Sequence, residues 1–116
     1  MLTWDELKQN REIINSIDWE VTPREMFEAY QLKSPGNWKY RSLPEVCYFY
    51  LSSWRGENKV ILMKRGYVHS EEIAEAPAPP ELVAAAVAKF EGEDLPRGQL
   101  PLDEPLRTWL QKELGV

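Results

Sequence analysis

The stretch from Glu45 to Val68 decides the fold, and it reads E-V-C-Y-F-Y-L-S-S-W-R-G-E-N-K-V-I-L-M-K-R-G-Y-V. Two runs rich in β-branched and aromatic residues flank the turn formers at 55–58, a pattern typical of a β-hairpin. Glycine at the first central position suits a type II′ turn, whose twist matches that of the strands. The predicted tip of the hairpin is therefore Gly56-Glu57.

This turn sets the register and the two faces of the hairpin, because side chains alternate along a strand. It aligns Trp54 with Lys59 and Tyr50 with Met63. One face then carries Cys47, Phe49, Leu51, Ser53, Val60, Leu62 and Lys64. The other face carries Tyr48, Tyr50, Ser52, Trp54, Lys59, Ile61, Met63 and Arg65. A two-stranded ribbon is marginally stable alone in water, so helices must cover at least one face. The purer hydrophobic set, the Cys47 face, is the predicted core.

Apolar residues at helical spacing, together with cap signals, predict four helices around this hairpin. They span residues 3–17, Pro23–Leu32, Pro80 or Glu81 to Glu91, and Glu104–Leu114. Trp38–Arg41 is a candidate third strand, and Ser70 either caps a single helical turn or continues the strand. The prediction is one domain, residues 1–116, of the α+β class. It has a central antiparallel β-hairpin, extended to a three-stranded meander if Trp38–Arg41 pairs, packed by about four helices.

Composition limits the compartment. Cys47 is the only cysteine, so no internal disulfide can form and a reducing interior is expected. The chain does not open with a charged region followed by an apolar run, and no apolar stretch approaches the roughly 20 residues that cross a bilayer. We therefore expect a cytoplasmic protein with no membrane contact.

Charge is unevenly distributed along the chain. The net charge is −5, yet residues 33–69 sum to +5 between segments of −4 and −6. Acidic helices lying over a basic ribbon would explain this pattern. The alternative is a site for a small anion or single-stranded nucleic acid, formed by Lys39, Arg41, Lys64 and Arg65 among stacking aromatic residues. The acidic balance of the whole chain weighs against nucleic acid, because nucleic-acid-binding domains are commonly basic.

Signals for catalysis, metals and cofactors are weak. A structural zinc site needs clustered cysteine and histidine, whereas Cys47 and His69 stand alone and 22 residues apart. A free cysteine in a strand is more often core than nucleophile. The acids Glu71, Glu72 and Glu75 leave an oxygen-ligand metal site open, but three acids beside a polyproline connector are more typical of a solvated surface. No glycine pattern resembles a phosphate-binding loop. We therefore predict no catalytic residue, no metal and no cofactor.

Contact with another protein is the remaining possibility. Interface cores are enriched in Tyr, Trp, Met and Arg. One face of the hairpin matches that composition, with Tyr48, Tyr50, Trp54, Ile61, Met63 and Arg65. If helices cover only the Cys47 face, these residues form an exposed patch of the kind that marks a partner site or homo-oligomer contact. If helices cover both faces, the patch becomes internal.

The chain also resembles an uncharacterised family of short cytoplasmic proteins from sulfate-reducing anaerobic bacteria. The resembling segments are I-D-W-E-V-T-P-R-E-M-F-E-A-Y at 17–30, the hairpin runs Y-F-Y-L-S-S-W and V-I-L-M-K-R, and R-T-W-L-Q-K-E-L at 107–114. The resemblance implies a role connected with anaerobic energy metabolism, and it supplies no catalytic residue. The leading hypothesis is therefore a non-enzymatic protein-interaction or accessory module.

Overall fold

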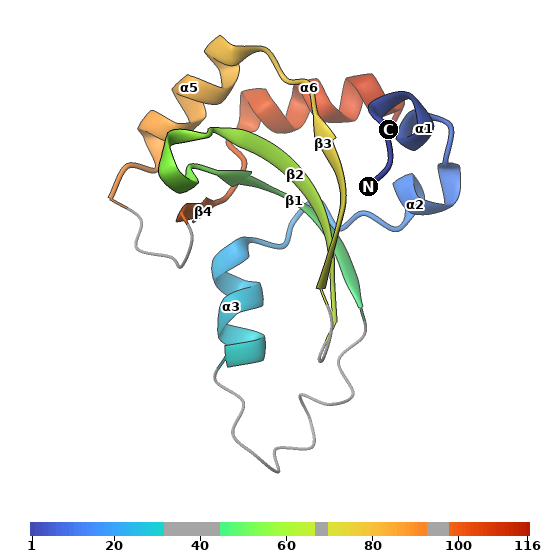
Figure 1. The fold of residues 1–116 in the computed structure, drawn as a ribbon, viewed down its shortest axis with the longest axis horizontal. Helices are drawn as coiled ribbons and strands as arrows, with labels where there is room; N and C mark the ends of the chain where they lie inside the picture. Colours follow the sequence, from blue (N-terminus) through green and yellow to red (C-terminus); the bar gives the residue numbers. More distant parts are fainter. Residues whose placement is uncertain (32–44, 67–69, 93–97) are drawn as a thin grey trace.

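The computed structural model describes residues 1–31, 45–66, 70–92 and 98–116. It has an α+β fold, as predicted, in which helices pack against a four-stranded antiparallel sheet (Figure 1). The described strands are β1 (Val46–Ser52), β2 (Lys59–Arg65), β3 (Ser70–Ala76) and β4 (Gln99–Leu100), in the spatial order β3-β2-β1-β4. The described helices are α1 (Trp4–Lys8), α2 (Arg11–Asn15), α3 (Pro23–Gln31), α5 (Pro80–Lys89) and α6 (Glu104–Leu114).

The hairpin forms, but its predicted register is wrong by two residues. Tyr50 faces Ile61 rather than Met63, and Ser52 is the last residue of β1 to pair with β2, opposite Lys59. The type II′ turn is also wrong, because a longer connection containing the 3₁₀ turn η1 (Trp54–Gly56) joins the strands. A shift of two residues keeps every side chain on its predicted face, because the strand period is two.

Contacts at the end of β1 explain this longer connection. The Ser53 amide donates to the Gly98 carbonyl over 3.0 Å, and the Ser53 hydroxyl donates to the same oxygen over 3.0 Å. Ser53 is therefore held toward β4 instead of pairing with β2. The chain then turns through Arg55 and Gly56, whose φ angles are 53° and 74°.

Two strands extend the hairpin beyond its prediction. Ser70 begins β3, a separate strand antiparallel to β2, so it neither caps a helical turn nor continues the second strand of the hairpin. β4 occupies part of a stretch with no predicted strand, and it pairs Leu100 with Leu51. The predicted third strand, Trp38–Arg41, lies outside the described residues. Strands β1, β2 and β3 form a meander within the sheet.

The predicted core face is confirmed. Cys47, Phe49, Leu51, Val60 and Leu62 are buried in one cluster on this face. The helical residues buried with them are Leu7 of α1, Ile14 of α2, Val83 and Ala86 of α5, and Leu106, Leu110 and Leu114 of α6. We call the opposite side the tyrosine face, defined by Tyr48, Tyr50, Ile61 and Met63. These four residues are also buried, in a second cluster with Met26 of α3.

The first predicted helix is wrong in one respect, since residues 3–17 form two short helices. The Asn10 side chain accepts a hydrogen bond from the Ile13 amide over 3.1 Å, and this N-cap starts α2 afresh. The other predicted helices are confirmed within a few residues. Thr22 accepts from the Glu25 amide at the start of α3, and left-handed Gly115 ends α6.

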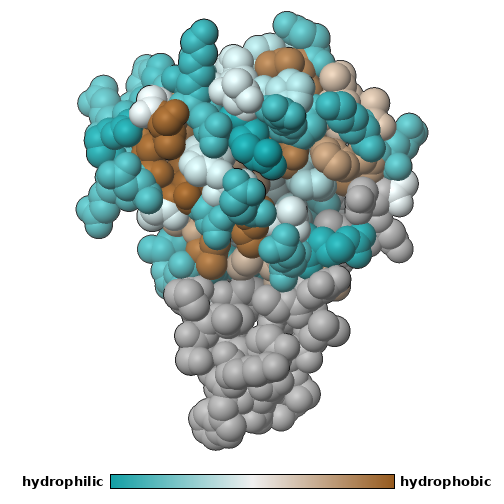
Figure 2. All heavy atoms as spheres, turned by 180° about the vertical axis from the view of Figure 1, so that it is seen from behind, coloured by the Kyte–Doolittle hydropathy of each residue, from teal (hydrophilic) through white to brown (hydrophobic). Residues whose placement is uncertain are grey.

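The surface seen from behind the view of Figure 1 is mostly hydrophilic, with hydrophobic residues in small groups between polar ones (Figure 2). Scattered apolar residues of this kind are normal on folded proteins. No helix within the described residues combines the length and the apolar character that a membrane span needs.

Asp103 offers a test of how α6 is fixed. Its buried carboxylate accepts from the Leu106 amide over 3.0 Å and lies 3.3 Å from Lys89 Nζ of α5. We expect Asp103→Ala to lower the free energy of unfolding by about 1–2 kcal/mol, because the helix loses its N-cap. Asp103→Asn should lose clearly less, because asparagine caps equally well and Lys89 is half exposed. Urea unfolding measures both, and equal losses would contradict the cap as the main contribution.

Candidate functional site

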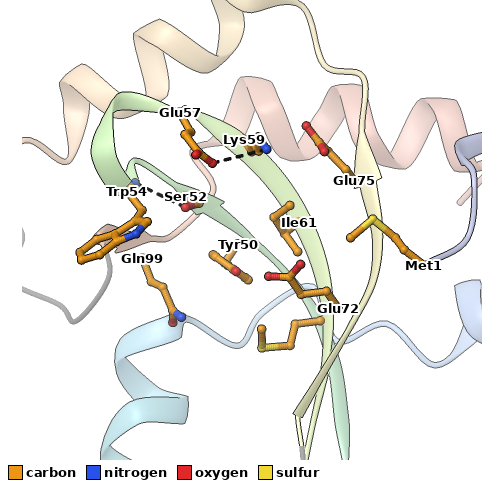
Figure 3. Close-up of a pocket in the computed structure, with 11 residues that line it drawn as sticks. Met1, Tyr50, Ser52, Trp54, Glu57, Lys59, Ile61, Glu72, Glu75 and Gln99 are labelled. Carbon is orange, nitrogen blue, oxygen red and sulfur yellow. Dashed lines mark hydrogen bonds and ion pairs between the residues drawn. The ribbon is translucent and has the colours of Figure 1, made fainter.

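A pocket of about 450 Å³ lies over the tyrosine face of the sheet (Figure 3). Every described strand contributes to its lining, together with the N-terminal residue and the connection between β1 and β2. The lining residues are Met1, Tyr50, Ser52, Trp54, Glu57, Lys59, Ile61, Met63, Glu72, Glu75 and Gln99. Tyr50 and Ile61 lie between Trp54 on one side and Met1 on the other. A volume of this size lies within the range of small-ligand pockets.

The pocket exists because α3 covers only part of the tyrosine face. Met26 of α3 packs in the same cluster as Tyr48, which is fully buried. The Tyr48 hydroxyl lies 3.9 Å from Met63 Sδ. Toward the η1 end of the sheet, Tyr50 and Ile61 line the pocket while each keeps only 5% of its surface exposed. They therefore form the floor of the pocket, and they are packed in the second buried cluster, with Met26, Tyr48 and Met63.

The predicted interface residues divide into two groups. Tyr50, Trp54, Ile61 and Met63 line the pocket, whereas Tyr48 and Arg65 are not part of its lining. Tyr48, Tyr50, Ile61 and Met63 are buried by the chain itself. The continuous exposed patch considered from the sequence is therefore not present in that form. What replaces it is a hollow with a buried floor.

Trp54 is the exposed aromatic residue of this pocket. It leaves the strand at η1, and 45% of its surface is exposed. Its amide donates to the Ser52 hydroxyl over 3.4 Å (Figure 3). The Arg55 guanidinium lies 5.2 Å from the centre of its ring, within the range of a cation–π interaction. The indole is thus anchored at its backbone and accessible at the rim.

A β-bulge places two carboxylates on the pocket side. Glu72 faces Met63 and Glu75 faces Ile61, with a register shift in β3 between them. Residues three apart in a regular strand point to opposite faces, but the extra residue of the bulge reverses that alternation. Glu72 and Glu75 therefore share the tyrosine face, while Ala74 faces Leu62 in the core.

The sequence did not identify Glu72 and Glu75 as pocket residues. Strand alternation could have placed only one of them on the correct face of the sheet. Alternation with the buried Ala74 and Ala76 could have placed Glu75 on the opposite face. The same alternation would have placed Glu72 in the core with the alanines. No residue type in Ser70–Ala76 marks the bulge that corrects this.

The pocket is acidic. The described lining side chains include the carboxylates of Glu57, Glu72 and Glu75 and the amine of Lys59, a formal charge of −2, or −1 when the N-terminal amine of Met1 is counted. Lys59 Nζ lies 3.4 Å from the Glu57 carboxylate. Within the described part of the chain, Glu72 and Glu75 have no ion-pair partner. Both are exposed to solvent.

The basic residues considered for an anion site are not brought together in the described residues. Lys64 Nζ lies 3.0 Å from the Glu45 carboxylate, and this hydrogen bond raises the pKa of Lys64 above its ordinary value. Arg65 is part-buried and already engaged, and it points to the opposite face from Lys64 because the two are neighbours in β2. Lys39 and Arg41 lie outside the described residues.

Cys47 is not among the residues that line the pocket. Cys47 is buried in the core cluster, and His69 lies outside the described residues. No group of three or more His, Cys, Asp or Glu in the described ranges could hold a metal ion. A second hollow beside Trp19 and Arg107 has a volume of about 10 Å³, the space of a single water molecule.

Comparison of the chain with models of protein families, with curated proteins and with solved structures found no match. The resemblance to proteins of sulfate-reducing bacteria therefore stays a prediction.

Two substitutions separate the floor of the pocket from its rim. Tyr50→Ala should lower the free energy of unfolding by about 3–5 kcal/mol, because it removes a buried ring. Trp54→Ala should cost clearly less, about 1 kcal/mol, because nearly half of the Trp54 surface is exposed. Tyr50→Phe keeps the ring and is the control for the hydroxyl. Urea unfolding followed by far-UV circular dichroism measures all three, and a Tyr50→Ala loss no larger than that of Trp54→Ala would contradict the assigned burial.

Proposed function

We propose that this protein is a non-enzymatic protein-interaction module whose partner docks at the pocket over the tyrosine face. The observation that carries the proposal is an indole, 45% exposed, at the rim of a 450 Å³ hollow with a buried aromatic and aliphatic floor. Tryptophan and tyrosine are the residues most often found at the energetic centre of protein interfaces. A rigid floor beside an accessible ring provides a preformed seat for one anchoring side chain of a partner.

The lining chemistry favours binding over catalysis. No histidine is among the described lining residues, and the Lys59 amine opposite Ser52 is paired with the Glu57 carboxylate, so the described side chains of the lining offer the Ser52 hydroxyl no unpaired nitrogen base. Glu72 and Glu75 are both exposed, whereas a carboxyl that acts as general acid is normally desolvated. These features support a pocket that holds a group without transforming it.

A different protein is a better occupant than a second copy of this chain. The chain carries a net charge of −5, so two copies repel each other at long range. The pocket itself is acidic and would add to that repulsion. The single buried cysteine suits a reducing compartment, and the cytoplasm remains the proposed location. The alternative, a small-anion or nucleic-acid site, receives no support from an acidic pocket.

Selection from a random peptide library displayed on phage tests this proposal without a known partner. The full chain is immobilised through its C-terminus, because Met1 lines the pocket. We expect enriched peptides that bind the wild type and bind Trp54→Ala at least about tenfold more weakly, as for a truncated hot-spot residue. Val116→Ala is the matched control, because Val116 is exposed and apolar but lies outside the lining. No enriched peptide, or peptides indifferent to Trp54→Ala, would refute the proposed site.

Light scattering distinguishes the second copy from the partner. We expect the mass of one chain for the wild type at micromolar concentration. A dimer that Trp54→Ala converts to a monomer would instead identify a second copy as the occupant.

A further inference from the structure

The β-bulge in β3 is held in place by a contact from another part of the chain. The Leu2 amide donates to the Ile73 carbonyl over 2.8 Å, and Leu2 bridges to Ala74. A bulge interrupts the ladder of hydrogen bonds and re-aims the side chains beside it. The contact from Leu2 supplies a partner for the backbone at this point. Glu72 and Glu75 are therefore directed over the pocket by a defined piece of backbone structure.

The two carboxylates lie above an apolar floor and form no ion pair with another described residue. Their cross-strand neighbours are Met63 and Ile61, which are buried. In Figure 3 the Glu72 carboxylate points toward Tyr50 and Ile61, whereas that of Glu75 points toward the Lys59 end. Glu57 already pairs with Lys59 over 3.4 Å, so the pocket retains two carboxylates for a ligand. A group that suits them carries a positive charge on an apolar stem.

The aromatic residues of the pocket fit the same kind of group. The face of an indole or phenol ring attracts lysine and arginine cations. The Trp54 ring already has the Arg55 guanidinium 5.2 Å from its centre. Tyr50 lies in the floor between Trp54 and β3, so a stem that crosses the floor meets aromatic surface before it reaches a carboxylate.

From these placements, and resting on the proposed function above, we infer that the docking segment of the partner is basic. It inserts a lysine or arginine side chain whose stem lies on Tyr50 and Ile61 beside Trp54, and whose cationic group pairs with Glu72 and Glu75. Complementary charge also favours the encounter, because residues 70–116 carry a net charge of −6.

The peptides enriched on the wild-type chain test this inference directly. We expect them to share a lysine or arginine next to apolar residues, and to bind more weakly as salt rises from 50 to 500 mM. Their affinity, measured by fluorescence anisotropy of labelled peptides, should fall roughly three- to tenfold for the double variant Glu72→Gln and Glu75→Gln, as expected for two exposed ion pairs. Glu71→Gln is the matched control, because Glu71 faces Lys64 on the other side of the same strand. It should leave the affinity within twofold.

The outcomes separate the inference from the function on which it rests. One outcome is that the peptides need Trp54 for binding but are neutral or acidic, or bind the double variant as well as the wild type. That outcome would support the docking site and contradict a basic partner. No peptide dependent on Trp54 would overturn both. Calorimetry with spermidine tests the last alternative. If the wild type binds spermidine, the double variant does not, and no peptide is enriched, the pocket is a site for small organic cations and the proposed partner protein is refuted. Unfolding curves in urea confirm that each variant is folded.

Discussion

The structure depends on one constraint: both faces of the β1–β2 ribbon are apolar, so both have to be removed from water. Leu51 and Leu62 are fully buried on the core face, and Tyr48 is fully buried on the tyrosine face. Burial of a large apolar side chain stabilises a fold by about 1.5–3 kcal/mol, so neither face can be left open without a large loss. The positions of the helices follow from this requirement.

The two faces are covered unequally, and the candidate site results from that inequality. Helices α1, α2, α5 and α6 pack on the core face, whereas α3 contributes Met26 to the cluster on the tyrosine face. The strands β3 and β4 widen the sheet beyond the hairpin and provide the sides of the pocket. The floor is therefore packed by the fold itself, while the rim carries the exposed Trp54 and two carboxylates that form no ion pair with another described residue. This division suits recognition, because a preformed seat costs little entropy when a partner binds.

The sequence predicted the α+β class, the hairpin, its core face and three of the helices, because these depend on periodicity and cap residues. It predicted the faces even though the register was wrong, since Tyr50 stays on the same side whether it meets Met63 or Ile61. The register itself depends on Ser53 bonding to Gly98, a contact between residues 45 positions apart. The first helix is split because Asn10 caps the start of α2, and an asparagine N-cap is a local feature that the sequence could have indicated.

The candidate site was predictable only in part. Tyr50, Trp54, Ile61 and Met63 were assigned to one face from alternation, and they meet in the pocket. The burial of Tyr50, Ile61 and Met63 was not predictable, because it depends on how far α3 extends over the sheet. Glu72 was not predictable either, because its direction is set by a bulge whose backbone bonds to Leu2, a residue far away in the sequence.

The central claim is that a partner docks on the tyrosine face beside Trp54, and the indole N–H signals of the protein test it most directly. Titration of the ¹⁵N-labelled chain with an enriched peptide should shift the Trp54 indole signal. It should leave those of Trp4 and Trp109 in place, because these two rings stack on each other 6.3 Å apart and pack against the core cluster behind the sheet. Shifts confined to Trp4 and Trp109, with Trp54 unmoved, would place binding on the helical side and contradict this account.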